Sequence, residues 1–199
     1  MKLSKHIMLK NSFLKNSLLL AFGITNLQAS LSQATEFKSI VNEKSTIGFT
    51  FKQMGVAMDG QFKKFTAAIS FDTAKPQNAK ASFEIDLASI DTGGPADEEA
   101  QGKAWFNTKV YPKATFVASQ IKASANNQFD VTGNLSIKGQ TREVKFPIKY
   151  TPQGNAGTFA GSLVMHRADF AIGEGNWSKF DVVANDIQIN FSISAVSTK

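Results

Sequence analysis

Residues 81–87 read Ala-Ser-Phe-Glu-Ile-Asp-Leu, and this stretch decides the fold class. Apolar side chains stand at Ala81, Phe83, Ile85 and Leu87, and polar side chains stand between them. Because successive side chains of a β-strand point to opposite faces, this period of two predicts a strand with one buried and one solvated face. Such strands are typical of an antiparallel sheet that covers an apolar core.

The same alternation returns along the chain from residue 45 onward. It predicts eight strands, at residues 47–51, 65–71, 81–87, 115–121, 129–137, 144–150, 159–165 and 183–193. Asp59-Gly60 and Lys138-Gly139 are tight-turn signals between strands. Around Phe116 the pattern does not decide which of two faces points inward, and we take the aromatic face as the inner one.

Two segments depart from this alternation. Pro95 precedes the acidic run Asp97-Glu98-Glu99, which suits the positive N-terminal end of a helix, so we expect a short helix near residues 95–105. Residues 169–181 are rich in glycine and aromatic residues, and we expect a long loop there.

The predicted fold class is all-β, an eight-stranded antiparallel barrel. We favour it over a sandwich because closure removes exposed strand edges.

The composition fits one globular domain. The chain has 199 residues, of which 42% are apolar and 19% charged, and this excludes disordered, collagen-like and multi-span membrane classes. It contains no cysteine, which excludes disulfides, thiolate metal sites and cysteine nucleophiles. The aromatic residues are 17 Phe against 2 Trp and 2 Tyr, which predicts an interior rich in rings without polar atoms.

The N-terminal segment has the pattern of a secretory signal peptide. Four lysines precede an apolar run at residues 18–24, and small residues follow it. We expect cleavage after Ser32-Gln33-Ala34, with Leu27-Gln28-Ala29 as the alternative site, so that residues 1–34 form the signal peptide and residues 35–199 the mature domain. The run is shorter than the roughly 20 residues of a membrane-spanning helix, which argues against an uncleaved anchor.

The charge distribution bears on location and partners. Without residues 1–34 the net charge falls from +6 to near +2, because that segment holds four lysines and no acidic residue. Export without cysteine favours the bacterial periplasm. The remaining basic residues are scattered among acidic ones and form no stripe that would neutralise phosphates, so we expect no nucleic-acid partner.

The residues also argue against an enzyme. His166 is the only histidine of the mature domain and no G-x-S-x-G motif is present, so a serine hydrolase has a single candidate base and no nucleophile turn. The consecutive carboxylates of residues 97–99 point in different directions on a helix, which does not suit a metal site. Paired carboxylates of a glycoside hydrolase, drawn from Asp86, Asp91 and Glu174, remain a remote alternative. We expect no catalytic residue and no metal.

A series of short stretches resembles a known family in order and spacing. The stretches are residues 47–52 (IGFTFK), 60–65 (GQFKKF), 69–72 (ISFD), 105–107 (WFN), 111–116 (YPKATF), 133–139 (GNLSIKG) and 167–177 (RADFAIGEGNW). From about Phe37 to Ala195 the chain resembles the YceI family of bacterial periplasmic proteins. The resemblance implies a lipocalin-like barrel with an elongated apolar cavity for a polyisoprenoid or another long-chain amphiphile, such as an isoprenoid quinone. From the strand pattern alone, a core filled by side chains remains the alternative to a cavity.

The inner strand faces supply most of the candidate lipid-binding residues. Met54 is included because a flexible thioether adapts to a sliding chain, with gap-filling in a core as the alternative. The aromatic residues beside the helix and the long loop are expected at the barrel mouth, either as a lid or as a plug. The full set is Phe49, Phe51, Met54, Phe65, Phe83, Ile85, Trp105, Phe116, Phe146, Phe159, Phe170, Trp177 and Phe191.

Arg167 is the candidate ligand for a polar head group, because a guanidinium binds phosphate or polarises a quinone carbonyl. A structural ion pair with Asp169 is the alternative. We therefore predict a periplasmic carrier of a long-chain isoprenoid lipid, with no cofactor besides that lipid. A non-enzymatic adaptor of a membrane electron-transfer complex, with a filled barrel, is the alternative function. A membrane protein partner is compatible with both.

Overall fold

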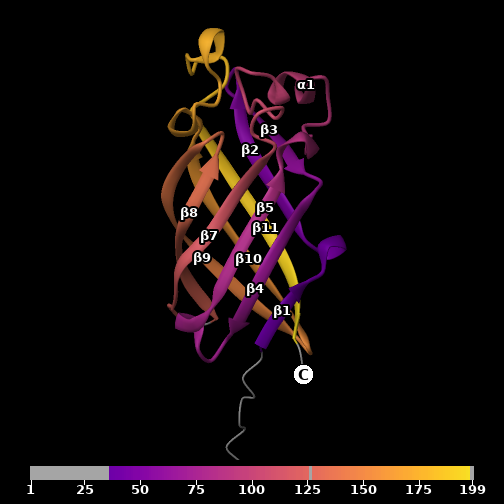
Figure 1. Cartoon of the computed structure of the whole chain (residues 1–199), viewed down its shortest axis with the longest axis vertical. Helices are drawn as coiled ribbons and strands as arrows, with labels where there is room; N and C mark the ends of the chain where they lie inside the picture. Colours follow the sequence, from indigo (N-terminus) through magenta and orange to yellow (C-terminus); the bar gives the residue numbers. More distant parts are fainter. Residues whose placement is uncertain (1–35, 126, 198–199) are drawn as a thin grey trace, which may run out of the picture. The chain divides into compact units, whose positions relative to one another are not determined.

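The computed structural model describes residues 36–125 and 127–197. The predicted signal peptide, residues 1–34, lies outside the described residues. The described chain forms one antiparallel sheet, and its strands are β1 (Glu36–Ile40), β2 (Thr46–Gln53), β3 (Val56–Phe62), β4 (Phe65–Asp72), β5 (Lys80–Asp86), β6 (Ile90–Asp91), β7 (Lys113–Ala123), β8 (Gln128–Ile137), β9 (Gln140–Gln153), β10 (Ala156–His166) and β11 (Asp186–Ser197). β11 pairs back with β1, so the sheet is a closed barrel (Figure 1).

Six of these segments are the halves of three interrupted strands. β1 continues into β2 through the 3-10 turn Asn42–Lys44, β3 into β4 through residues 63–64, and β5 into β6 through the 3-10 turn Leu87–Ser89. Both halves of each strand keep the same neighbouring strand. The strand β1–β2 lies beside β3–β4, through the pairs β1 with β4 and β2 with β3. The strand β3–β4 lies beside β5–β6, through the pairs β4 with β5 and β3 with β6. The barrel therefore has eight strands, as the sequence predicts.

The ladder between β10 and β11 shows how the alternation positions the side chains. It runs without a break from Ala156 opposite Val196 to His166 opposite Asp186. Phe159 and Met165 on β10 and Ile193 on β11 are buried, whereas His166, in the other phase, is exposed. The period of two thus places apolar side chains inside the barrel, as expected for a sheet that is solvated on one face.

Two tight turns have both central residues in the left-handed region, which type I′ hairpins require. Lys138 and Gly139, with φ of 49° and 77°, join β8 to β9 where the sequence predicts a turn. Met54 and Gly55, with φ of 51° and 82°, join β2 to β3. The turn predicted at Asp59-Gly60 is wrong, because both residues lie within β3. Gly60 serves a close approach instead, since a Cβ there would stand 2.4 Å from Cζ of the cross-strand Phe49.

Aromatic side chains pack together near one end of the barrel. Phe37 of β1 is fully buried, and its ring packs edge-on against Tyr150 and Phe159 with centroids 5.6 and 5.4 Å apart. Phe71 packs against Phe129 and Phe159 at 5.0 and 4.9 Å. Such edge-to-face pairs add to the area that burial removes from water. This aromatic cluster forms the core near the end of the barrel at which β1 begins.

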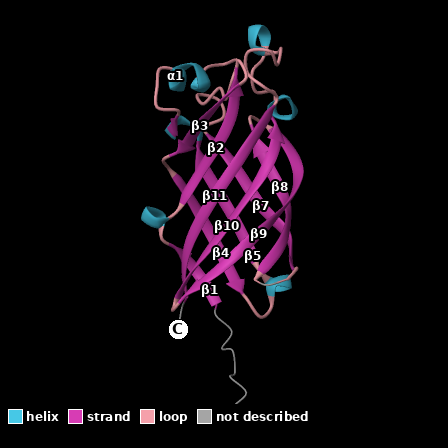
Figure 2. Ribbon diagram, turned by 180° about the vertical axis from the view of Figure 1, so that it is seen from behind, coloured by secondary structure: helices cyan, strands magenta, loops and turns pink. Residues whose placement is uncertain are grey.

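The irregular segments gather at the opposite end of the barrel (Figures 1 and 2). One is the helix α1 (Ala96–Gln101) with the turns that follow it, which confirms the short helix expected near residues 95–105. The other is the long loop between β10 and β11, which contains the 3-10 turns Arg167–Phe170 and Gly175–Trp177. Together they form a lid, residues 92–112 and 167–185, over the barrel mouth.

Candidate functional site

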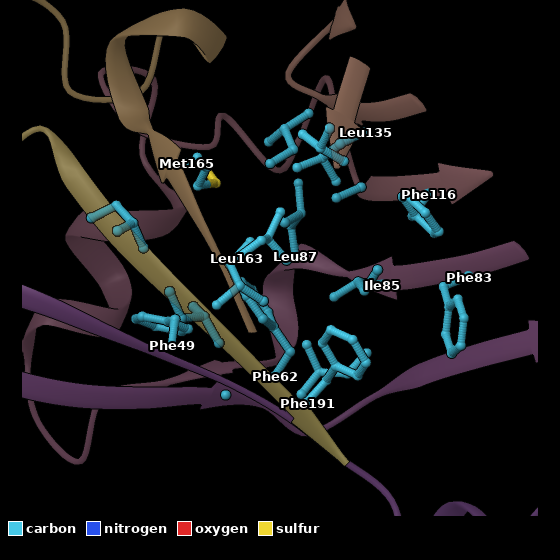
Figure 3. A pocket seen from close by; sticks show the side chains of 18 of the residues that line it. Phe49, Phe62, Phe83, Ile85, Leu87, Phe116, Leu135, Leu163, Met165 and Phe191 are labelled. Carbon is cyan, nitrogen blue, oxygen red and sulfur yellow. The ribbon is translucent and has the colours of Figure 1, made fainter. Parts of the chain in front are cut away.

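An elongated cavity of about 300 Å³ runs inside the barrel. It extends from Ile121 and Phe159 near the aromatic cluster to Trp105 and Trp177 in the lid. Aliphatic and aromatic side chains from opposite strands point into it (Figure 3). Its volume is at the lower end of the range of about 300–1,000 Å³ that is common for small-molecule sites. The interior is therefore not filled by side chains.

Most of the predicted lipid-binding residues line this cavity, from six different strands or from the lid. Phe116 is among them, which confirms that the aromatic face of its strand points inward. The lining residues that were predicted are Phe49, Phe51, Phe83, Ile85, Trp105, Phe116, Phe146, Phe159, Trp177 and Phe191.

Three predicted residues lie elsewhere. Met54 is 75% exposed, because it is at the tip of the β2–β3 hairpin and not on an inner face. Phe65 is half-buried: it packs against the core cluster that contains Ile85 and also lines the groove at the strand interruptions, but it is not among the residues that line the cavity. Phe170 is buried, but it packs in the core cluster beneath the lid with Leu87 and Ile172 and does not line the cavity.

The sequence analysis missed many of the aliphatic lining residues. Leu87, Leu163 and Met165 lie on inner faces that the alternation had already identified, but aromatic residues were preferred over them. Phe62 follows the misplaced Asp59-Gly60 turn, so its strand was not recognised. Figure 3 shows the side chains of all four at the cavity, and further lining residues include Ile47, Ile69, Phe71, Leu135, Ile137, Val144, Ile148, Ile187, Ile189 and Ile193.

The two segments of the lid are joined to each other. The indole N–H of Trp177 donates a hydrogen bond of 2.9 Å to Oε1 of Glu99 on α1. The Trp105 and Trp177 rings lie 5.4 Å apart. The main-chain N–H groups of Gly173 and Glu174 both donate to the carbonyl of Ala104 at 2.8 Å. The lid therefore covers the mouth as one connected layer in this structure.

Arg167 holds the long loop from inside. Its guanidinium is 1% exposed and donates to the carbonyl oxygens of Ile172, Gly173, Trp177, Lys179, Val183 and Ala184 at 2.7–3.2 Å. Removal from water lowers the pKa of this group below its ordinary value. Gly173, with φ of 80°, has no room for a side chain, because a Cβ would stand 1.9 Å from the Arg167 Nη1.

Both sequence interpretations of Arg167 need correction. An arginine has five N–H groups, and here they serve six carbonyl oxygens, so none is left for a lipid head group. The alternative pair with Asp169 does not form either, since Asp169 is exposed and the guanidinium donates to main-chain oxygens. The 3-10 turn directs the two side chains to different surroundings. Arg167 is therefore a structural residue of the lid.

A second buried cation fixes the same loop from the other side. Nζ of Lys138, at the β8–β9 turn, donates to the carbonyls of Ala171 and Lys103 at 2.6 and 3.2 Å. It also forms an ion pair of 2.7 Å with Glu174. The Lys138 side chain is only 6% exposed. Since Lys103 belongs to the helix segment, this lysine ties both parts of the lid to the barrel.

A polar groove of about 560 Å³ marks the outer wall where the strands are interrupted. Lys63 forms an ion pair of 2.8 Å with Asp91, and this ammonium, together with the N–H of Gly93, lowers the pKa of the carboxyl. Lys113 pairs with Glu84 along the same groove. These pairs are solvent-exposed, so they contribute little to stability.

The cavity lining contains few ionisable groups. Of the described residues that line it, only Lys80, Glu99 and Arg167 are ionisable. The described part of the chain contains no group of three or more His, Asp or Glu side chains that could hold a metal. Nor does any helix within residues 36–125 and 127–197 have the length and apolarity to span a membrane.

Comparisons with known proteins agree with this architecture. The UPF0312 protein plu2095 of Photorhabdus laumondii is 34% identical over 135 residues, which cover 66% of this chain and 70% of that protein. The crystal structure of Burkholderia cenocepacia BcnA matches with a TM-score of 0.77 and 39% identity, over 79% of this chain and all of BcnA. A polyisoprenoid binding domain from Saccharophagus degradans, implicated in plant cell wall breakdown, has the same fold at 16% identity, with a TM-score of 0.61 over 83% of this chain and 99% of that domain. A profile of the YceI-like domain matches residues 39–195, and the chain therefore belongs to the YceI family.

Proposed function

We propose that this protein binds and carries a long-chain isoprenoid lipid, such as a polyprenyl lipid or an isoprenoid quinone, in its barrel cavity. The observation that carries the proposal is the cavity itself, which is long, covered by a lid and lined almost throughout by apolar side chains. The fold is shared with a polyisoprenoid binding domain, which supports a ligand of this class. We further propose that the mature domain, residues 35–199, does this in the periplasm.

The energetics favour such a ligand. Burial of one methylene group contributes about 0.8 kcal/mol, so a five-carbon isoprene unit contributes roughly 4 kcal/mol when it leaves water. Phenylalanine supplies this contact area without a polar atom that would need a partner. A few isoprene units thus provide enough free energy for binding, even after the cost of ordering the chain is subtracted.

The proposal also assigns no chemical reaction to the barrel. The cavity places no base beside a nucleophile, and its acidic lining residue, Glu99, accepts the hydrogen bond from Trp177. Lys80 lies near the opposite end, on β5. A binding role needs none of these groups to exchange protons.

The alternative role as an adaptor of a membrane complex has one observation in its favour. Apolar side chains are exposed at Met54 and Val56 of the β2–β3 hairpin and at Phe180 and Val182 in the long loop of the lid. Met54 N–H donates to the Val182 carbonyl, so the two groups are neighbours. Exposed apolar groups mark interaction surfaces, but a carrier also needs such a surface where it loads and releases its lipid.

Mass spectrometry of an organic-solvent extract tests the proposal. The protein is purified from the periplasm of its own host, and a second sample is refolded from denaturant as the control. A stoichiometric prenyl lipid or quinone in the first extract alone is the expected result and identifies the ligand. If neither extract contains lipid above background while the protein is folded, the carrier function is wrong and the adaptor function is preferred.

A further inference from the structure

One residue that lines the cavity carries a polar atom without a partner in the protein. Within residues 36–125 and 127–197, the indole Nε1 of Trp105 is the one buried side-chain nitrogen or oxygen that makes no hydrogen bond. The two buried cations that hold the lid and its second indole are engaged, since Arg167 and Lys138 donate to carbonyls and Trp177 donates to Glu99. Folded proteins rarely leave such a donor unpaired, because losing its contact with water costs free energy.

The ring that carries this donor is held in place. The guanidinium of Arg167 lies over the Trp105 ring, with Cζ 5.5 Å from the ring centroid, and the ring of Trp177 packs against it at 5.4 Å. Arg167 in turn is fixed by its carbonyl partners. Trp105 therefore cannot turn freely to find an acceptor elsewhere, and its donor is oriented before any ligand arrives.

The choice of tryptophan here contrasts with the rest of the cavity. The chain has 17 phenylalanines and only two tryptophans, and phenylalanine supplies the other aromatic walls of the barrel. A phenylalanine at position 105 would offer an apolar ring without an unpaired N–H. Of the two indoles in the wall, Trp177 donates to Glu99, so the unpaired N–H of Trp105 is a chemical feature that packing alone does not require.

The position of Trp105 gives the donor a direction along the cavity. Trp105 lies in the lid, beside the lining residues Thr92 and Glu99, which are also polar. The opposite end is lined by apolar side chains such as Ile121 and Phe159, and the nearest ionisable lining residue there, Lys80, is exposed to solvent. A ligand with one polar end matches this asymmetry when that end lies under the lid.

We infer that the indole N–H of Trp105 donates a hydrogen bond to an oxygen atom at the polar end of the bound lipid. This inference rests on the proposed lipid-binding function and makes it more specific. The ligand is an amphiphile with an acceptor oxygen (a hydroxyl, carbonyl or phosphate oxygen) at its head. The head lies beneath the lid, and the tail points toward the aromatic cluster around Phe37.

A cycle of two proteins and two ligands tests the contact. The ligands are geranylgeraniol and the C20 hydrocarbon that lacks only its oxygen, and the proteins are the wild type and Trp105→Phe. We expect the substitution to weaken binding of the alcohol about ten-fold and to change binding of the hydrocarbon less than about two-fold, because only the alcohol loses a hydrogen bond. Trp177→Phe is the matched control, and it should weaken both ligands equally.

The outcomes separate this inference from the proposed function. Equal effects of Trp105→Phe on the two ligands would refute the Trp105 contact and leave the carrier function intact. Absence of binding by either ligand to the wild type would refute the isoprenoid function and, with it, this inference. The melting temperature of each variant shows that the comparison is made on folded protein.

Nuclear magnetic resonance of the wild type gives a second test that needs no variant in the binding step. Since the chain has two tryptophans, ¹⁵N labelling of the indoles gives two signals, which Trp177→Phe assigns. Geranylgeraniol should move the Trp105 indole proton downfield, as expected when it enters a hydrogen bond, whereas the hydrocarbon should not. The same shift with both ligands would contradict the inference.

Discussion

Substitution of Arg167 by lysine tests whether carbonyl oxygens, and not a carboxylate, organise the lid. The Arg167 guanidinium serves six main-chain carbonyls from a position that is 1% exposed. Lysine keeps the positive charge but has three N–H groups in place of five. It therefore leaves about half of these oxygens without their donor, because Lys138 binds a different carbonyl of the loop, that of Ala171.

The expected loss follows from the number of broken contacts. We take each lost hydrogen bond to lower the free energy of unfolding by about 1 kcal/mol. This value is low for a charged donor, because water replaces part of the lost contact once the loop loosens. About three lost bonds reduce the free energy of unfolding by about 3 kcal/mol. In a domain of this size 1 kcal/mol changes the Tm by roughly 2–4 °C, so Arg167→Lys should melt roughly 6–12 °C below the wild type.

Thermal unfolding followed by circular dichroism measures this change, and limited proteolysis shows whether the loop opens locally before the barrel unfolds. Asp169→Asn is the matched control, since it removes the carboxylate that an ion pair would use, and its Tm should stay within about 2 °C of the wild type. The reasoning is refuted if Arg167→Lys matches the wild type in both Tm and cleavage rate, or if Asp169→Asn is the more damaging change.

Three further predictions concern the wall, the aromatic cluster and the lid. Gly133→Ala should lower stability by about 1–3 kcal/mol, because its Cβ would stand 2.5 Å from Cζ of Phe116, and urea unfolding should detect the loss; an unchanged midpoint would contradict this packing. Burial raises the pKa of the Tyr150 phenol, so the stability it provides is present below its unfolded pKa of about 10 and is lost as pH rises through the folded value. As the pH rises from about 9 to 11, the free energy of unfolding should therefore fall less for Tyr150→Phe than for the wild type. Equal losses would contradict a raised pKa of the Tyr150 phenol. Trp177→Phe breaks the bond to Glu99 and should speed lipid release about two- to ten-fold in a stopped-flow assay, with little change in Tm; unchanged release would show that this bond does not hold the lid.

Strand alternation was sufficient to predict the barrel, because it is a local signal that depends on burial alone. The phase of residues 81–87 identified the inward Phe83 and Ile85, and the same reasoning worked for Phe159 and Phe191. It did not reveal that three strands are interrupted, since a short 3-10 turn such as Leu87–Ser89 changes the backbone without interrupting the apolar pattern.

The errors arose where a residue type has more than one physical use. Gly60 was interpreted as a turn residue, although here it makes room for the ring of Phe49. Arg167 was expected to meet a ligand head group or the nearby carboxylate of Asp169, because a guanidinium pairs well with both. Its actual partners are carbonyls spread over residues 172–184, and only the folded loop brings these together. The unpaired N–H of Trp105 likewise depends on which acceptors lie nearby in space.

The pairing of β1 with β11 has a consequence for how the protein folds. These strands come from opposite ends of the described chain, so the ring closes only when both are in place, and each hydrogen bond across that seam must offset the entropy of a very large loop. The hairpins from β7 to β10 connect neighbouring segments and can form early. High contact order of this kind is typical of domains that fold in milliseconds to seconds, so folding should be slow, with closure of the seam as its last step.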